Sequence, residues 1–201
     1  DAKKMCAKLM RVDIKHLNTR FVSSSTWLDA IRKKNNHRFD RLHYIDIPFS
    51  RDKSKLPSIS KINALTGIRQ AQSILASPKA SKTQKALNLR ILIHVLGDIH
   101  QPLHTTTEIS KAYPDGDQGG NLFPLSRSPA GSNLHRFWDN GGGILLGKSS
   151  KKNIAEKARE FESKWPCIIA NRQKKAEEWI SSSHQLALTQ AYTLLPHTKP
   201  T

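Results

Sequence analysis

Apolar residues recur at helical spacing along most of this chain, most clearly in two neighbouring segments. In residues 60–76 they fall three or four positions apart, as on one face of an amphipathic helix: Ile62, Leu65, Ile68, Ala71 and Leu75. Pro78 ends that segment, and Ser81 offers an N-cap for a long helix from 82 to about 99. Its stretch 91–96 is apolar almost all round, as in buried helices and buried strands, and the length of the segment favours a helix.

Weaker helical patterns cover much of the remaining chain. The further helices that we expect lie over 2–11, 21–31, 153–165 and 173–194, with a short one from Ser132 or Asn133 through Trp138. Residues 41–49 should be extended or loop-like, and no strand pair is convincing. The pattern therefore predicts an all-α fold, an irregular bundle of about six helices in a single domain over 1–201.

The segment 105–132 differs from the rest because proline and glycine dominate it. These breakers are Pro114, Gly116, Gly119, Gly120, Pro124, Pro129 and Gly131. A structureless connection of this length inside a compact domain is usually functional. We expect it to form a loop that packs over a site.

Composition narrows the classes of function. The chain has 201 residues, with 33 Lys+Arg against 16 Asp+Glu, a net charge of +17. This surplus favours polyanionic partners such as nucleic acid, anionic lipid or phosphorylated substrates. No apolar run approaches the roughly 20 residues of a membrane-spanning helix. The chain has only two cysteines, Cys6 and Cys167, which excludes a scaffold of many disulfides. They could form one disulfide bridge, or each could be a small buried hydrophobic residue.

Two short motifs carry the candidate chemistry. In HVLGDIHQPLH, His94 and Asp98 are four residues apart and share one face of a helix, and in NLHRFWDN the same spacing joins His135 and Asp139. A lone histidine in an apolar run is more often a core residue than a ligand. A buried carboxylate, however, needs a cation, and no Lys or Arg lies between positions 90 and 111. The two pairs together indicate a metal, and imidazole with carboxylate and no thiolate suits zinc.

These motifs, with GDQGGN between them, resemble the zinc-dependent, single-strand-specific class I nucleases of fungi, plants, trypanosomatids and some bacteria. Upstream, STWLDAIR and LHYIDIPF match the other two ligand segments of that family in order, so the resemblance spans roughly 25–140. Zinc-dependent bacterial phospholipase C shares the fold. The resemblance implies secretion or a periplasmic location, and we expect a monomer.

The resemblance also implies the metal ligands. One zinc would be held by Asp29, His43, His94 and Asp98, and a second by His104, His135 and Asp139. Asp98 would bridge to a third zinc, which the family completes with an N-terminal tryptophan and a nearby histidine. Here residue 1 is Asp, and His16 follows a different local pattern. We therefore expect either a segment ahead of Asp1 that carries these ligands or the loss of the third site.

Further roles follow from the same resemblance. Asp29 would orient the attacking water or take its proton, and Arg32, three residues later, would hold the phosphate, its alternative being a surface charge. Tyr44, next to His43, would stack on a base, its alternative being a core tyrosine. Asn140 could donate to the phosphate.

Three other polar residues near the motifs look less central. Asp117 in the Gly-rich loop could accept a hydrogen bond from His104. His100 is expected to support a ligand rather than to be one, and Asp46 to make a structural hydrogen bond.

The resulting hypothesis is a zinc phosphodiesterase that cleaves single-stranded RNA and DNA to 5′-phosphate products and also acts on 3′-nucleotides. One alternative is a phospholipase C, which would need a choline-binding cavity and an apolar surface. Another is a non-catalytic, basic nucleic-acid-binding protein with an incomplete metal centre.

Overall fold

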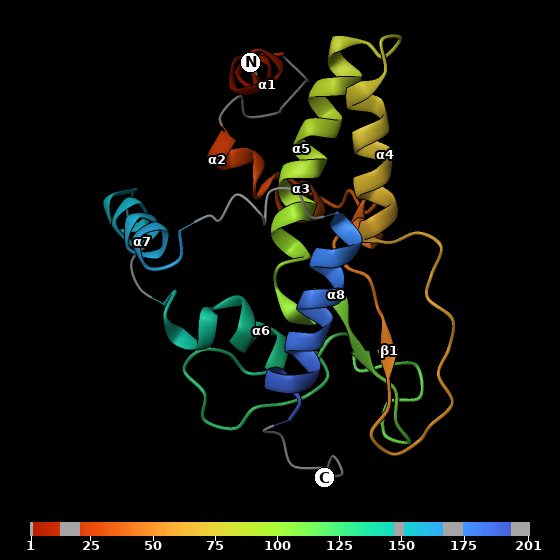
Figure 1. Ribbon diagram of the computed structural model, residues 1–201. Helices are drawn as coiled ribbons and strands as arrows, with labels where there is room; N and C mark the ends of the chain where they lie inside the picture. The colour runs from red at the N-terminus through yellow and green to blue at the C-terminus, as the bar shows by residue number, and fades with distance from the viewer. Residues whose placement is uncertain (1, 13–20, 147–150, 167–174, 194–201) are drawn as a thin grey trace.

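The protein, described by a computed structural model over residues 2–12, 21–146, 151–166 and 175–193, is mostly helical. Its α-helices are α1 (Ala2–Met10), α2 (Phe21–Ser24), α3 (Trp27–Arg32), α4 (Ala64–Ala76), α5 (Lys82–Asp98), α6 (Leu134–Asp139), α7 (Lys151–Lys164) and α8 (Ala176–Leu186) (Figure 1). Shorter helical turns are η1 (Asp40–Leu42), η2 (Pro102–Thr105), η3 (Gly141–Gly143) and the π-helical η5 (Ala187–Ala191). The predicted all-α class is confirmed, and none of the described helices is long and apolar enough to cross a membrane.

Helices α4 and α5 form the antiparallel hairpin that organises the fold (Figure 1). Each begins with a capping box, Asn63 with Thr66 for α4 and Ser81 with Gln84 for α5, which satisfies backbone N–H groups at the helix start. The Asn63 cap explains why α4 begins at 64 rather than at the expected 60. The apolar stretch 91–96 is helical, as its length predicted.

The main core lies where α3 and α8 pack against this hairpin. Its fully buried members include Leu28 from α3, Ile68 from α4 and Val95 from α5, with Ile180 of α8 only 4% exposed. Burying such side chains supplies about 1.5–3 kcal/mol each. The packing holds the C-terminal half of α5 against α3, and this places the chemical motifs of both helices together.

A small parallel sheet corrects the expectation that the chain has no strand pair. Strand β1 (Pro48–Phe49) pairs with β2 (Thr107–Glu108). The Thr107 N–H donates to the Ile47 carbonyl, and the Ile109 N–H to the Phe49 carbonyl. Each strand has two residues, too few for an alternating pattern to show in the sequence. The pairing ties the Gly-rich loop to the segment that follows His43.

Two further boundaries differ from the prediction. The helix expected over 21–31 is broken into α2 and α3 at Ser25 and Thr26, because the Ser25 carbonyl accepts a hydrogen bond from the imidazole of His94. The helix expected over 173–194 is described from Ala176 and widens into the π-helical η5. Cys6 is a half-buried free thiol, and Cys167 and His16 lie outside the described residues.

Candidate metal centre

A cavity of about 930 Å³ opens where α3, α5, α6 and the Gly-rich loop meet. Imidazoles and carboxylates dominate its lining, which consists of Asp29, Arg32, His43, Tyr44, Asp46, Asp98, Leu103, His104, Gln118, Asn121, His135 and Asp139. Six of the seven expected metal ligands are in this set, and the seventh, His94, lies buried just behind it. The fold therefore brings the expected ligands together from segments that are far apart in the sequence.

The first ligand cluster lies at the C-terminal end of α5. His94 Nε2 lies 3.0 Å from His43 Nδ1, and Asp98 Oδ2 lies 3.1 Å and 3.2 Å from these two nitrogens. Asp29 Oδ1, from α3, is 3.8 Å from His43 Nδ1. The helical spacing places His94 and Asp98 on one face of α5, and the end of η1 presents His43 to them. Asp29, His43 and His94 thus offer atoms that all lie within 4.8 Å of one another, and Asp98 contacts the two imidazoles.

The second cluster joins the end of α5 to α6. Asp139 Oδ1 lies 3.7 Å from His104 Nε2, and Asp139 Oδ2 lies 3.7 Å from His135 Nε2. The two imidazole rings lie nearly side by side, with centroids 4.8 Å apart. His104 belongs to η2, which Pro102 starts directly after the turn that ends α5. The change of direction at Pro102 is what carries His104 away from the first cluster.

Backbone carbonyls orient three of the four imidazoles. The Nδ1 atom of His94 faces the carbonyl of Ser25, that of His104 the carbonyl of His43, and that of His135 the carbonyl of Gly119. A carbonyl only accepts, so each Nδ1 carries the proton and each Nε2 lone pair points toward its cluster. This is the second-sphere arrangement found around metal-ligating histidines.

The glycine that supports His135 could not be another residue. Gly119 has φ of +61°, and a Cβ there would lie 2.3 Å from the Leu103 carbonyl oxygen. Its close approach lets the Gly-rich loop lie against η2 while its own carbonyl reaches His135 at 2.9 Å. The expected role of this loop, packing over the site, agrees with this contact.

Electrostatics keep the first cluster ready for a cation. Burial raises the pKa of Asp98, but the imidazoles of His43 and His94 lower it more, so that it falls to about 2. Burial lowers the pKa of His94, and the nearby negative charge of Asp98 outweighs this and raises it. Asp98 is therefore ionised at neutral pH, in contact with two nitrogen ligands.

In the second cluster the pKa values of the two imidazoles shift in opposite directions. Burial raises the pKa of Asp139, but its contacts with His104 and Gln101 give a net lowering. Burial lowers the pKa of His104, but the contact with Asp139 outweighs this and raises it. Burial lowers the pKa of His135, which favours the neutral imidazole that a metal requires.

A buried carboxylate oxygen without a hydrogen bond indicates that a metal ion fits the first cluster. Asp98 Oδ2 is buried and has no hydrogen bond within the described part of the chain, although two imidazole nitrogens lie close to it. His94 Nε2 directs its lone pair to the same point. A cation between these atoms would satisfy both, and nitrogen and oxygen ligands without thiolate suit zinc. The residues present therefore fit the metal that the motifs indicated.

Arg32 and Tyr44 both line the cavity. Arg32 Nε lies 3.4 Å from Asp40 Oδ2, so the guanidinium is anchored at one side and exposed over half of its surface. Tyr44 is 40% exposed, which argues against a core role. Both side chains stand where a substrate in the cavity would meet them.

Asn140 and Asp117 lie elsewhere. The Asn140 amide donates to the Ala130 carbonyl at 2.6 Å, and Asn140 does not line the cavity. Fully buried Asp117 accepts hydrogen bonds from the Tyr192 hydroxyl and the Glu108 N–H, and the carbonyl of His43 takes the place expected for it beside His104. The phosphate contact of Asn140 and the His104 contact of Asp117 are not favoured by this arrangement.

His100 does not support a ligand as expected. Its Nδ1 hydrogen-bonds the Leu96 carbonyl, and its ring packs against Trp179 on the far side of α5. His100 lies two residues past the end of α5 and does not line the cavity.

Two site residues were missed or undervalued. Gln101 donates from Nε2 to Asp139 Oδ1 at 2.9 Å and so holds a ligand of the second cluster. Asp46 lines the cavity, where burial and the charge of Asp117 raise its pKa to about 6 against the opposing effect of His104. Gln101 lies inside the HQPLH motif, and this was its only sequence signal.

Comparison with known proteins agrees with this geometry. The family model for S1/P1 nuclease matches residues 1–200. The chain belongs to the S1/P1 nuclease family. Over 127 residues it is 30% identical to Nuclease S1 of Aspergillus oryzae, covering 57% of this chain and 39% of that protein. It is 31% identical to Endonuclease 1 and 32% identical to Endonuclease 2 of Arabidopsis thaliana, each over 125 residues.

These matches confirm the family resemblance drawn from the motifs. The matched part covers 56% of this chain in both Arabidopsis comparisons, and 39% and 40% of those relatives. The chain thus spans about two fifths of the length of the curated S1/P1 relatives that it matches. The two ligand clusters described above lie within the family match.

Proposed function

We propose that this S1/P1 family member is a zinc-dependent phosphodiesterase. Its substrates would be single-stranded RNA and DNA, cleaved to 5′-phosphate products, and it would also remove phosphate from 3′-nucleotides. The observation that supports this most is the convergence of two imidazole–carboxylate clusters on one cavity that also presents Arg32. Such clusters match the sites that cleave phosphoesters with closely spaced metals.

The ligand sets would be those described above. Asp29, His43, His94 and Asp98 would hold one zinc, and His104, His135 and Asp139 another. In the family pattern, Asp98 would also contact a third. When bound, zinc supplies Lewis-acid polarisation of the phosphate and a water acidic enough to ionise near neutral pH. The carbonyl contacts of the three histidines would keep the Nε2 atoms in place during turnover.

The chain's own residues would then act on the substrate. Arg32, held by Asp40, would donate two parallel hydrogen bonds to the phosphate and offset the charge that builds in the transition state. Asp29 is half exposed at the cavity wall and would orient the water and take its proton.

Selection of single strands would come from Tyr44. Its exposed ring beside His43 would stack on one base, whatever its identity, and a base inside a duplex offers no free face. We also infer an exported monomer, since zinc ligands without thiolates are compatible with an oxidising compartment.

The test is reconstitution of the metal-depleted chain with zinc. We expect cleavage of end-labelled single-stranded DNA and RNA, 5′-phosphate ends on the products, and much slower cleavage of duplex. Metal analysis of the same sample gives the zinc content. Phosphatidylcholine is the comparison substrate: its turnover without cleavage of nucleic acid would replace the nuclease with a phospholipase. Full zinc occupancy and tight binding of DNA without any cleavage would indicate a binding protein instead.

A further inference from the structure

Acidic residues are absent from two long stretches of this chain. Residues 53–97 contain eight Lys+Arg and no Asp or Glu, and residues 2–12 contain four Lys+Arg and again no Asp or Glu. The first stretch includes α4, the turn that follows it and α5 up to its last residue but one, and the second includes α1. The positive surplus is therefore not spread evenly along the sequence.

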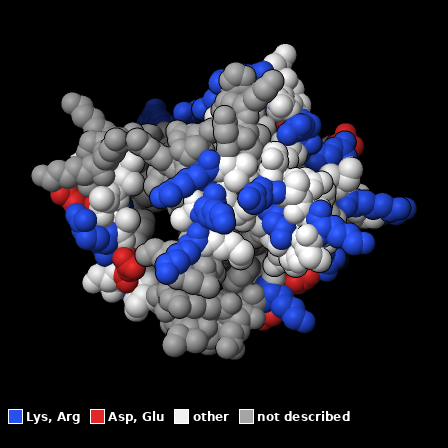
Figure 2. Space-filling view, turned by 90° about the horizontal axis from the view of Figure 1, so that it is seen from above, with Lys and Arg blue, Asp and Glu red and all other residues white. Residues whose placement is uncertain are grey.

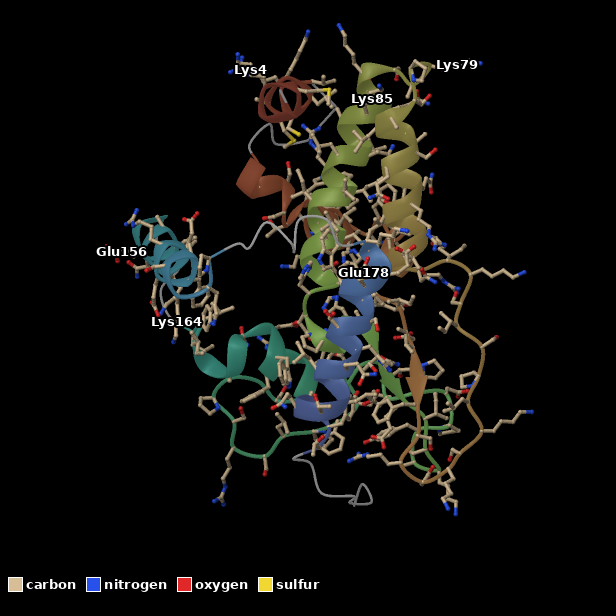
Figure 3. The ribbon with its side chains drawn as sticks, viewed as in Figure 1. Lys4, Lys79, Lys85, Glu156, Lys164 and Glu178 are labelled. Carbon is tan, nitrogen blue, oxygen red and sulfur yellow. The ribbon has the colours of Figure 1, made fainter. Side chains whose placement is uncertain are left out.

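The fold brings these two stretches to one end of the molecule. Leu9 and Met10 of α1 pack against Leu89 of α5. Figure 3 shows Lys4 on α1 and Lys79 and Lys85 at the α4–α5 turn, all at the end where α5 begins. Seen from that side, Lys and Arg side chains spread over the face, with Asp and Glu confined to its margins (Figure 2). We call the group of Lys4, Lys8, Lys79, Lys82 and Lys85 the cationic end.

Four cations elsewhere in the described structure are paired with carboxylates. Arg51 binds Glu108, Arg69 binds Glu177, and Lys157 binds Glu160. Lys79, Lys82 and Lys85, in contrast, make no ion pair with any described residue. The N-terminus of α5, which begins among them, adds the positive end of its dipole. The charge of these three lysines thus remains uncompensated by described carboxylates, and such a positive field attracts polyanions.

The cationic end is too far from the ligand clusters to touch the same phosphate. Lys82 and Asp98 are the first and last residues of α5 and are 16 positions apart, which corresponds to about 24 Å along the helix. At a stacked spacing of about 3.4 Å per nucleotide, about seven nucleotides cover that span. Only a substrate longer than a few nucleotides could reach both.

We propose that the cationic end is a second, remote binding surface for the phosphate backbone of a single-stranded nucleic acid whose other part lies in the metal cavity. Among the described residues, this surface presents few apolar groups, and Met5 is its one large exposed apolar side chain. An anionic membrane surface would call for several such side chains to insert. The backbone of a nucleic acid needs only cations, and its binding tolerates any base sequence.

This inference rests on the proposed nuclease function, and binding and cleavage test the two separately. The variant carries Lys79→Gln, Lys82→Gln and Lys85→Gln, which remove charge and keep most of each stem. The matched control carries Lys53→Gln, Lys55→Gln and Lys61→Gln, an equal change of charge on the exposed loop ahead of α4. Circular dichroism and thermal unfolding verify that both variants fold as the parent does.

Binding is measured on metal-depleted protein with fluorescent oligothymidylates from two to about 30 nucleotides, at several salt concentrations. For long strands we expect the slope of log affinity against log salt to decrease in magnitude by about two in the variant. Three lysines are removed, and each single-strand phosphate contact contributes about 0.7 to this slope. Affinity at low salt should fall at least about tenfold. Dinucleotide binding should be unchanged, and the control should resemble the parent.

Zinc-loaded protein supplies the other readout. The variant should cleave a dinucleotide at the parental rate and long strands with a raised KM. Equal losses in variant and control, or equal losses for short and long strands, would overturn the remote surface. The proposal would also be overturned if the variant bound vesicles of phosphatidylcholine and phosphatidylserine more weakly than the parent but bound oligothymidylates equally well. If the parent protein cleaves no substrate but the variant shows the expected loss of binding, the proposed nuclease function is refuted and the remote binding surface stands.

Discussion

Asp98 carries more of the proposed chemistry than any other single residue. Its carboxylate faces two imidazole nitrogens at 3.1 Å and 3.2 Å and has a buried oxygen without a hydrogen bond among the described residues. Asp98→Asn keeps the shape of the side chain but replaces a negative ligand. We expect loss of bound zinc and of cleavage, measured by metal analysis and by a single-strand cleavage assay. Asp52→Asn, on the exposed surface, is the control, and full zinc content in Asp98→Asn would contradict the ligand role.

The same carboxylate gives a pH dependence to the stability of the metal-depleted chain. Its pKa is lowered from 3.8 to about 2 in the fold, so ionised Asp98 stabilises the folded state above its unfolded pKa. That contribution, about 2 kcal/mol, is lost as the pH falls from about 4 through 2. Urea unfolding of the parent and of Asp98→Asn between about pH 2 and 6 should converge at the acid end. Parallel curves would contradict the assignment.

Tyr44 tests recognition of the base rather than of the phosphate. Tyr44→Ala removes the exposed ring beside His43 and should lower kcat/KM for dinucleotides by about 10- to 100-fold, since stacking contributes about 1–3 kcal/mol per base. Tyr44→Phe retains the ring and should retain activity. A small phosphodiester without a base is the decisive substrate, because its hydrolysis should be the same in all three proteins. A uniform loss would mean that Tyr44 supports the fold instead.

At the scale of elements, the Gly-rich loop packs closely against η2, the turn that follows α5. Gly119→Ala would place a Cβ against the Leu103 carbonyl in a left-handed conformation, and we expect a loss of about 1–3 kcal/mol of stability together with weaker zinc binding at His135. Gly97→Ala is the matched control, because a Cβ there meets nothing within 4 Å and alanine is the better helix former. It should leave stability equal or slightly higher. Urea unfolding and metal analysis measure both, and equal effects would contradict the close approach.

The elements also show where sequence pattern succeeds. The capped hairpin of α4 and α5 was predictable because its signals are local: an N-cap at Ser81, a stop at Pro78 and apolar positions at helical spacing. The proximity of His94 to Asp98 and of His135 to Asp139 was predictable because four-residue spacing fixes geometry within one helix. Strand β1 was not, because two residues pair with β2 only through a contact between distant segments.

Side-chain roles outside the helices were the least predictable. Asn140 follows a ligand directly in sequence, yet the end of α6 turns it to the Ala130 carbonyl. Asp117 of the Gly-rich loop was expected to accept from His104, but it accepts from the Tyr192 hydroxyl and the Glu108 N–H. Gln101 gained its role only because α6 brings Asp139 to it. Each case depends on the partner that tertiary packing supplies.

At the scale of the whole molecule, one buried polar group ties the C-terminal helical segment to the loops. The Tyr192 hydroxyl, just past η5, donates to Asp117 at 2.7 Å, and Arg51 binds both Glu108 and the Tyr192 carbonyl. Tyr192→Phe would leave a buried carboxylate short of one donor and should cost about 1–3 kcal/mol. Tyr113→Phe, whose more exposed hydroxyl donates to the Leu122 carbonyl, should cost less. Chemical denaturation compares the two, and equal losses would contradict the central position of Tyr192.

His43 serves both ligand clusters through different atoms. Its imidazole faces Asp98 and His94, while its main-chain carbonyl accepts from the Nδ1 of His104 in the other cluster. The spacing between the two clusters therefore depends in part on the backbone of a single residue, whose ring faces one cluster and whose carbonyl group supports the other. A substitution of the His43 side chain would remove a ligand and leave this spacing intact, whereas a displacement of its backbone would move both clusters together.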